Sequence, residues 1–496
     1  MNERFGRHNG AAAFGGMAKL RLTRRGFLGA GLAFAAAGTV PRASAAKTAG
    51  FGFEAITHGI DGHHHVAPGH DPRVLMRWGD GVTVAAPAFD PHRQSAAAQT
   101  TQFGYNSDFI GYLPLPWGSD NSRHGLLCVN HEYCIEELMF PGLGAYDKEF
   151  SQATRALAKI EMAAIGGAIV EVSRHPGGHW AVVPDSRFAR RITTGGTVMR
   201  LSGPAAGHTR LKTSADPSGT RVIGTAANCS GGMTPWGTWL TAEENFTYCF
   251  GSDIADDREA DVDPALVDHP ESRNYRRLGI PSRGYVWSRF ERRWNIDREA
   301  NEANRFGWIV EIDPRDPESI PVKRTALGRF THEGAAPVIN GDGRVIVYSA
   351  DDYYFEYFFR FVSTRTFDPA LGVANGDLLD HGTLSVARFD ADGGVAWLPL
   401  IFGDGPLTTE NGFQSQADIA IETRRAADLL GATLMDRPEG VAVDPDADKL
   451  YLSLTKNQRR GADNIDAVHS RADNLWGQIV ELTAPGGDHA AERFSW

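Results

Sequence analysis

A cysteine and two adjacent carboxylates lie at opposite ends of one short stretch of the chain. Cys229 belongs to a Gly-rich turn, Asn-Cys-Ser-Gly-Gly, and Glu243 and Glu244 follow the strand-like run Trp-Gly-Thr-Trp-Leu. A strand advances about 3.3 Å per residue, so a turn followed by five or six extended residues can return the carboxylates to the end of another strand. A soft thiolate together with hard carboxylates indicates iron or zinc beside calcium or magnesium.

Similar polar endings follow three other runs of strand-forming residues. From Glu244 to Asp351 the spacing is 107 residues, and from Asp351 to Asn457 it is 106 residues. A Glu-Gly pair also precedes Asp351 and Asn457 by the same 18 residues. Together with Cys229 and Glu243, the candidate metal ligands are Glu132, Glu244, Glu333, Asp351, Asp352, Glu439 and Asn457.

The elements that must position these residues are predicted to be strands. Short runs rich in Val, Ile, Trp and Tyr recur between Gly, Asp and Pro, whereas helical periodicity is clear only in 152–165 and 423–430. Segments such as 389–397 have the pattern of a hairpin. A repeated strand and hairpin with ligand-type residues at equivalent ends predicts an all-β fold, a β-propeller whose innermost strands line a central mouth. A β-sandwich is the alternative, and it would scatter the acids along a rim.

We expect residues 46–496 to form a single propeller domain with loops and short helical insertions. The segment 255–304, rich in Asp, Arg, Glu and Pro, is expected to be an insertion over one face. The chain stops on the amphipathic run Arg-Phe-Ser-Trp, so the last blade is expected to be missing, and exposed edge strands would then result.

Several carboxylates brought together are costly unless a cation neutralises them. An oxygen-rich group of this kind suits calcium, which accepts six to eight oxygens. Arg437 and Lys456 lie beside Glu439 and Asn457 in the sequence and could bind phosphate oxygens, although ion pairing with those acids is the alternative. His332 could ligate metal or donate to a phosphate oxygen. The sequence contains no Gly-x-Ser-x-Gly elbow and no Gly-Lys-Ser/Thr phosphate loop, so hydrolysis here would depend on metals.

Residues 1–45 have the pattern of a twin-arginine export signal. Arg24-Arg25 precedes the short apolar run 29–40, and Ala43-Ser44-Ala45 offers a small-residue cleavage site. The run is shorter than the roughly 18 residues that a membrane-spanning helix needs. We therefore expect export by the twin-arginine machinery, a periplasmic or secreted location, and no stable membrane span after cleavage.

Charge and cysteine content exclude other classes. The formal net charge of −11 argues against nucleic acid as a partner, because phosphate contacts need clustered Lys and Arg. Four cysteines are too few for a disulfide scaffold, although an oxidising compartment would allow a bond such as Cys134 to Cys249.

These motifs occur together in one known family. From about residue 66 to the C-terminus the chain resembles the PhoX-type alkaline phosphatases. The segments that carry the resemblance are 77–80, 102–109, 130–132, 201–207, 228–245, 332–335 and 435–439. The resemblance implies a six-bladed propeller, an iron ligand at Cys229, calcium as a further cofactor, and an exported phosphatase that hydrolyses phosphate monoesters of small molecules.

Two other functions fit the same pattern. One is a secreted calcium-binding propeller that recognises a glycan or protein without catalysis. The other is a calcium-dependent lactone or diester hydrolase on the same scaffold. The cysteine disfavours a purely calcium-binding role, because calcium prefers oxygen ligands.

Overall fold

The computed structural model describes residues 53–143, 151–255, 261–282, 284–444 and 448–496. The predicted export signal therefore lies outside the described residues. The chain divides into two compact units, residues 1–74 and residues 75–496, and all strands and helices described below belong to the second unit. Among the described residues, none of the helices combines the length and apolar character needed to cross a membrane.

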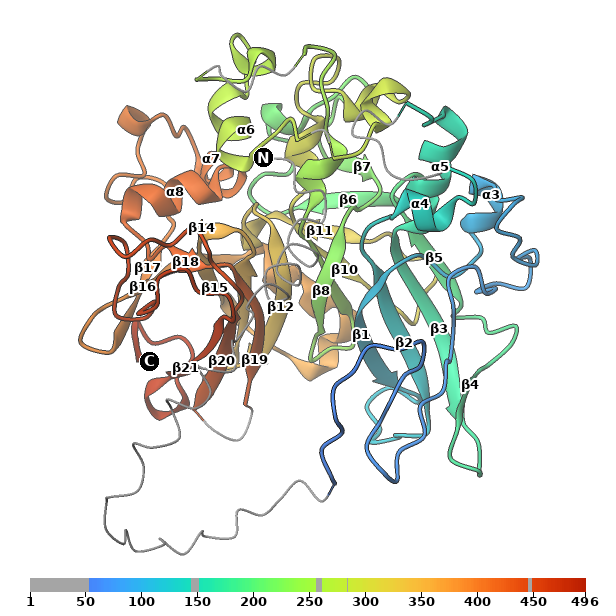
Figure 1. The fold of residues 1–496 in the computed structure, drawn as a ribbon. Helices are drawn as coiled ribbons and strands as arrows, with labels where there is room; N and C mark the ends of the chain where they lie inside the picture. Colours follow the sequence, from blue (N-terminus) through green and yellow to red (C-terminus); the bar gives the residue numbers. More distant parts are fainter. Residues whose placement is uncertain (1–52, 144–150, 256–260, 283, 445–447) are drawn as a thin grey trace, which may run out of the picture. The chain divides into compact units, whose positions relative to one another are not determined.

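The first sheet has the strand order β1-β2-β3-β4, and β5 pairs with β3 (Figure 1). Its strands are β1 (Ser107–Pro114), β2 (His124–His131), β3 (Gly166–Arg174), β4 (Trp180–Val182) and β5 (Arg190–Thr193). The second sheet has the order β7-β6-β11-β10-β9-β8. Its strands are β6 (Val198–Ser202), β7 (Arg221–Ile223), β8 (Asn228–Met233), β9 (Trp239–Glu243), β10 (Ile309–Ile312) and β11 (Val322–Arg324).

The third sheet has nine strands in the order β12-β13-β15-β16-β17-β22-β21-β20-β19, and a separate ribbon pairs β14 with β18. The nine strands are β12 (His332–Ile339), β13 (Arg344–Asp351), β15 (Phe358–Thr366), β16 (Gly382–Phe389), β17 (Gly394–Pro399), β19 (Pro438–Val443), β20 (Lys449–Leu454), β21 (Gln478–Thr483) and β22 (Arg493–Ser495). The ribbon strands are β14 (Tyr354–Glu356) and β18 (Met435–Asp436). The predicted 389–397 hairpin is present, with Phe389 opposite Val395 and Gly393 at a φ of 87° in its turn.

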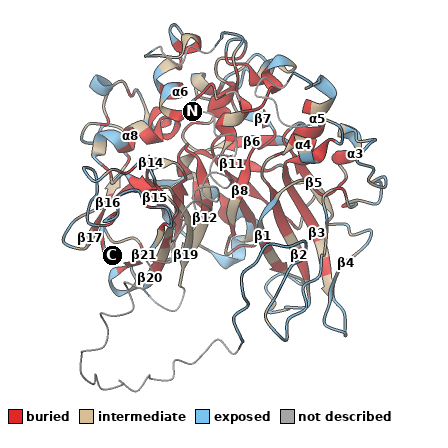
Figure 2. Cartoon of the chain, in the orientation of Figure 1, coloured by how far each residue is buried: buried red, intermediate tan, exposed pale blue. Residues whose placement is uncertain are grey.

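Within the described ranges, helices are few and short, and in Figure 1 they gather at one end of the sheets. They are α3 (Ala96–Gln99), α4 (Glu136–Met139), α5 (Arg155–Ala164), α6 (Ser272–Leu278), α7 (Gln416–Ile421) and α8 (Thr423–Leu430). The described part of the expected insertion consists of α6 and short 3-10 turns. The strands are mostly buried (Figure 2), and the larger core packs Leu240, Phe359 and Phe361 against α7 and α8.

Four strands, β1, β8, β12 and β19, hold the inner position of the repeated units and contact one another in that order. Each pairs with the strand that follows it in the chain, and each pairing has a register irregularity near the start of the inner strand. The predicted all-β propeller class is therefore confirmed. One detail of the prediction was wrong: the strands with polar ends, β2, β9, β13 and β20, are second in their units rather than innermost.

Candidate metal and phosphate site

The second residue of every inner strand carries a group that could bind a cation. These residues are Asp108 in β1, Cys229 in β8, Glu333 in β12 and Glu439 in β19. The residue just before the inner strand has a positive φ in three of the four units: 57° at Asn106, 52° at Ala227 and 50° at Arg437. A left-handed residue that is not glycine is strained, and such residues concentrate at functional sites.

The residue that follows the second strand supplies the partner position in each unit. It is Glu132 after β2, Glu244 after β9 and Asp352 after β13, whereas the fourth unit has the neutral Thr455 after β20. The pairing explains this equivalence, because the last residue of each second strand lies opposite the first residue of its inner strand.

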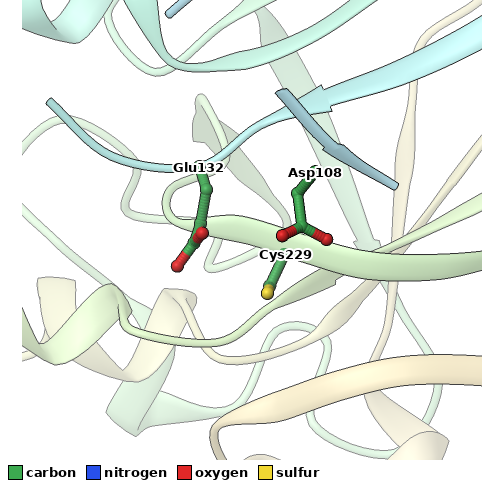
Figure 3. A group of neighbouring side chains, drawn as sticks. All are labelled: Asp108, Glu132 and Cys229. Atoms are coloured by element: carbon green, nitrogen blue, oxygen red, sulfur yellow. The ribbon is translucent and has the colours of Figure 1, made fainter. Parts of the chain in front are cut away.

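Cys229 is the meeting point of two groups of candidate ligand atoms. Its sulfur and one carboxylate oxygen each from Asp108 and Glu132 all lie within 4.8 Å of one another, and Figure 3 shows the three side chains converging. The same sulfur forms a second group of that size with oxygens of Glu244 and Glu333. Residues from three units of the fold thus bring one thiol and four carboxyl groups together.

Buried polar side chains hold the backbone of these ligands. The Asn130 amide donates to the backbone oxygens of Cys229 and Ser230, the latter at 3.0 Å, and it accepts from the Thr241 hydroxyl at 2.8 Å. The partly buried Asn245 side chain donates to the side chain of Glu244, at Oε2, over 2.5 Å. The position of the thiol therefore depends on side chains from β2 and β9.

The electrostatics of the group favour a bound cation. Burial, with the nearby Asp108, raises the pKa of Glu132 to about 8. Burial and the charge of Glu333 raise the pKa of Glu244 well above its ordinary value, and burial with Asp352 does the same for Glu333. Burial and Glu244 likewise raise the pKa of the Cys229 thiol. These acids resist ionisation because they lack a counter-charge, and a bound metal ion would supply it. A thiol together with several carboxylates fits a first-row transition metal beside calcium.

Two predicted ligands lie elsewhere, each directly before one of the residues that follow a second strand, Glu244 and Asp352. Glu243 is fully buried and pairs with Lys323, whose Nζ lies 2.7 Å from Oε1, while the amides of Gly307 and Trp308 donate to its other oxygen. Asp351 is fully buried and pairs with Arg424 at 2.6 Å, and it accepts from Thr331. Successive residues of a strand point to opposite faces, so these two carboxylates face protein cations rather than the group.

Two other predicted residues are also engaged in local bonds. The His332 ring lies between the Ser349 hydroxyl, at 2.8 Å, and the Gly328 carbonyl, at 2.9 Å, and burial lowers its pKa to about 4. The Asn457 amide donates to Asp436 at 2.7 Å. These contacts assign both side chains to positions behind the site rather than within the group.

Arg437 lies at the edge of the group, where its charge acts on Glu244. Its Nη2 lies 2.6 Å from Asp352 and 3.4 Å from Glu439. Although burial opposes it, the charges of these acids raise the pKa of Arg437. Glu439 is partly buried, and burial with Asp352 raises its pKa to about 7. Lys456 follows Thr455 directly and is partly exposed.

Asp108 is the one member of the group that the sequence prediction missed. The signal was present, because the Glu333-Gly334 and Glu439-Gly440 pairs mark the second residue of an inner strand, and Asp108 and Cys229 hold that position in the other two units. Burial raises the pKa of Asp108, and Cys229 contacts it. All four cysteines belong to the described residues and are buried, and no disulfide bond joins Cys134 to Cys249.

Comparison with known proteins identifies the family. Residues 51–496 match the family model described as alkaline phosphatase PhoX. A solved structure of Pseudomonas fluorescens PhoX in complex with vanadate, a transition state analogue, is 40% identical with a TM-score of 0.79, covering 87% of this chain and 73% of that one. A comparison with curated proteins found no match. The chain belongs to the alkaline phosphatase PhoX family and is a phosphoric ester hydrolase.

Proposed function

We propose that the protein is an exported, metal-dependent phosphatase that hydrolyses phosphate monoesters of small molecules. The observation that carries this proposal is the convergence of Cys229 with Asp108, Glu132, Glu244 and Glu333, with Arg437 at its edge. The structure of the related Pseudomonas protein with a transition state analogue of phosphoryl transfer supports the same reaction here.

The donor types support a different cation for each set of ligands. Cys229 with Glu244 and Glu333 suits iron, because a thiolate is a soft ligand. Asp108 and Glu132, extended by Asp352 and Glu439, offer the oxygen ligands that calcium prefers. When bound, these ions supply positive charge at the phosphoryl oxygens and lower the pKa of water.

The protein's own part is to bind and orient the phosphoryl group. The planar guanidinium of Arg437 can donate two parallel hydrogen bonds to phosphoryl oxygens. Its backbone is held in a left-handed conformation and its Nη2 is held by Asp352, so the fork is positioned before substrate arrives. Lys456 would add a point charge on the same side. The neutral Thr455 keeps a fourth inward carboxylate away from the anionic substrate.

The proposal also includes export of the protein from the cytoplasm. The Arg24-Arg25 pattern and the short apolar run support passage through the twin-arginine machinery to a periplasmic or secreted location. Changing both arginines to lysine should retain the precursor in the cytoplasm, measured by fractionation. Equal export of both forms would remove this part of the proposal.

The activity is tested on purified protein loaded with iron and calcium. We expect hydrolysis of phenyl phosphate that a chelator abolishes and that re-added metal restores. A protein that binds calcium without hydrolysing the ester would support the non-catalytic alternative, and hydrolysis of a lactone or diester alone would support the third function.

A further inference from the structure

The fourth unit differs from the other three in charge. Where the first three units place a carboxylate after the second strand, the fourth has Thr455, followed by Lys456 and, three residues later, Arg459. Arg437 precedes its inner strand. The acidic ligands therefore come mainly from three units, and basic side chains gather on the fourth.

An aromatic ring links two of these arginines. Tyr354, in the β14–β18 ribbon, lies opposite Asp436, the residue before Arg437. The Cζ of Arg437 lies 5.7 Å from the centroid of the Tyr354 ring, and the Cζ of Arg459 lies 3.9 Å from the same centroid. Both distances are within the range of a cation–π contact. Tyr354 of the ribbon thus contacts both Arg437, which pairs with Asp352 beside the candidate ligands, and Arg459 of the loop after β20.

The two neighbouring arginines after β20 have different roles. Arg460 is buried, and its guanidinium donates to Asp436 at 2.6 Å and to the backbone oxygens of Asn464 and Leu434. It also lies 5.1 Å from the ring of Phe355, whose φ is 63°. Arg459 is exposed. Arg460 therefore secures the loop to the ribbon, and Arg459 is an exposed residue whose guanidinium lies over the Tyr354 ring.

We propose that Tyr354 and Arg459 form a leaving-group subsite that favours phosphate monoesters carrying a second anionic group. This inference rests on the proposed function, with the scissile phosphate at Arg437. An ester bound there would extend its leaving group past the Tyr354 ring toward Arg459. A guanidinium binds a carboxylate or a second phosphate through parallel hydrogen bonds, whereas a neutral leaving group makes no such contact.

The test compares phenyl phosphate with 3-carboxyphenyl phosphate on the metal-loaded protein. The measured quantity is the ratio of kcat/KM for the carboxylated ester to that for phenyl phosphate. We expect Arg459→Ala to lower this ratio about tenfold, since a hydrogen bond to a charged group contributes about 1.5 kcal/mol. Arg459→Lys should retain part of the preference, and Tyr354→Ala should lower it because the ring that supports Arg459 is lost.

A matched control is Arg365→Ala, which removes an exposed arginine of β15 that pairs with Asp377. The control should leave the ratio unchanged, and salt should weaken the wild-type preference because the Arg459 charge is exposed. A wild type that hydrolyses phenyl phosphate while Arg459→Ala leaves the ratio unchanged overturns this inference alone. A wild type that hydrolyses neither ester overturns the proposed function and this inference with it.

Discussion

Adjacent carboxylates occur twice in this protein, and in each case the two neighbours have opposite surroundings. Glu243 and Asp351 end their strands and face Lys323 and Arg424, whereas Glu244 and Asp352, the next residues, face the group around Cys229. Glu243 and Asp351 are neutralised by buried cations of the protein itself. Glu244 lies among other acids, Asp352 has Arg437 as its counter-charge at the edge of the same group, and burial raises the pKa of both residues. Position on a strand, rather than residue type, therefore separates a structural acid from a candidate ligand.

Removing a protein cation should have the largest effect on stability. Lys323→Met leaves the fully buried Glu243 without its counter-charge, so we expect a loss of about 3–5 kcal/mol in the free energy of unfolding. Denaturant unfolding of the metal-free protein measures this loss. The double change Lys323→Met with Glu243→Gln should recover most of it, and a single variant as stable as wild type would contradict the assigned role.

Removing a carboxylate from the group should have the opposite effect on the metal-free protein. Glu244→Gln deletes one of several mutually repelling buried acids, so the unfolding free energy should hold or rise. Metal content should fall, and phenyl phosphate hydrolysis should drop by about two orders of magnitude. Comparison with Glu243→Gln sharpens the contrast, because that variant should lose stability instead.

The metal-free protein should become less stable as pH rises. The pKa of Glu132 is about 8 in the folded protein and near its ordinary value when unfolded, so the folded state binds more protons between about pH 4.5 and pH 8. The unfolding free energy therefore falls as pH rises through this window. Thermal melts at several pH values measure the fall, and metal loading should remove it. A melting temperature that rises with pH in the metal-free protein would contradict the account.

Asn457→Ala should have the smallest effect. The variant loses a buried hydrogen bond to Asp436, which we expect to cost about 1.5 kcal/mol. Metal content should not change, because the structure places this amide behind the site. Loss of metal in the variant would restore Asn457 as a ligand.

The sequence alone predicted the repeated units and most of the group, but it did not predict the register. The spacing from Glu244 to Asp351 is one residue short of the structural equivalence between Glu244 and Asp352. Side chains alternate between faces, so this single step exchanged a ligand position for an ion-pair position. The cations that decide the matter, Lys323 and Arg424, are 80 and 73 residues from their partners, and no local pattern connects them.

The same dependence on register explains why the sequence indicated His332 as a site residue and did not indicate Asp108. His332 and Glu333 are adjacent and both could bind metal, but only the second residue of an inner strand faces the group. The irregularities in the pairing of β1 and β8 also shift the register after the second residue, so counting along the chain cannot align them. Three-dimensional pairing was needed to place Asp108 beside Cys229.

The most direct test of the central claim is the metal content of Cys229→Ser. Serine keeps the size and polarity of the side chain but removes the soft sulfur at which both groups of ligand atoms meet. We predict that elemental analysis will find the bound iron lost and the calcium partly retained, with phenyl phosphate hydrolysis abolished and the fold preserved by circular dichroism. Iron content and turnover equal to those of the wild type would contradict the claim that Cys229 holds the metal of a phosphatase.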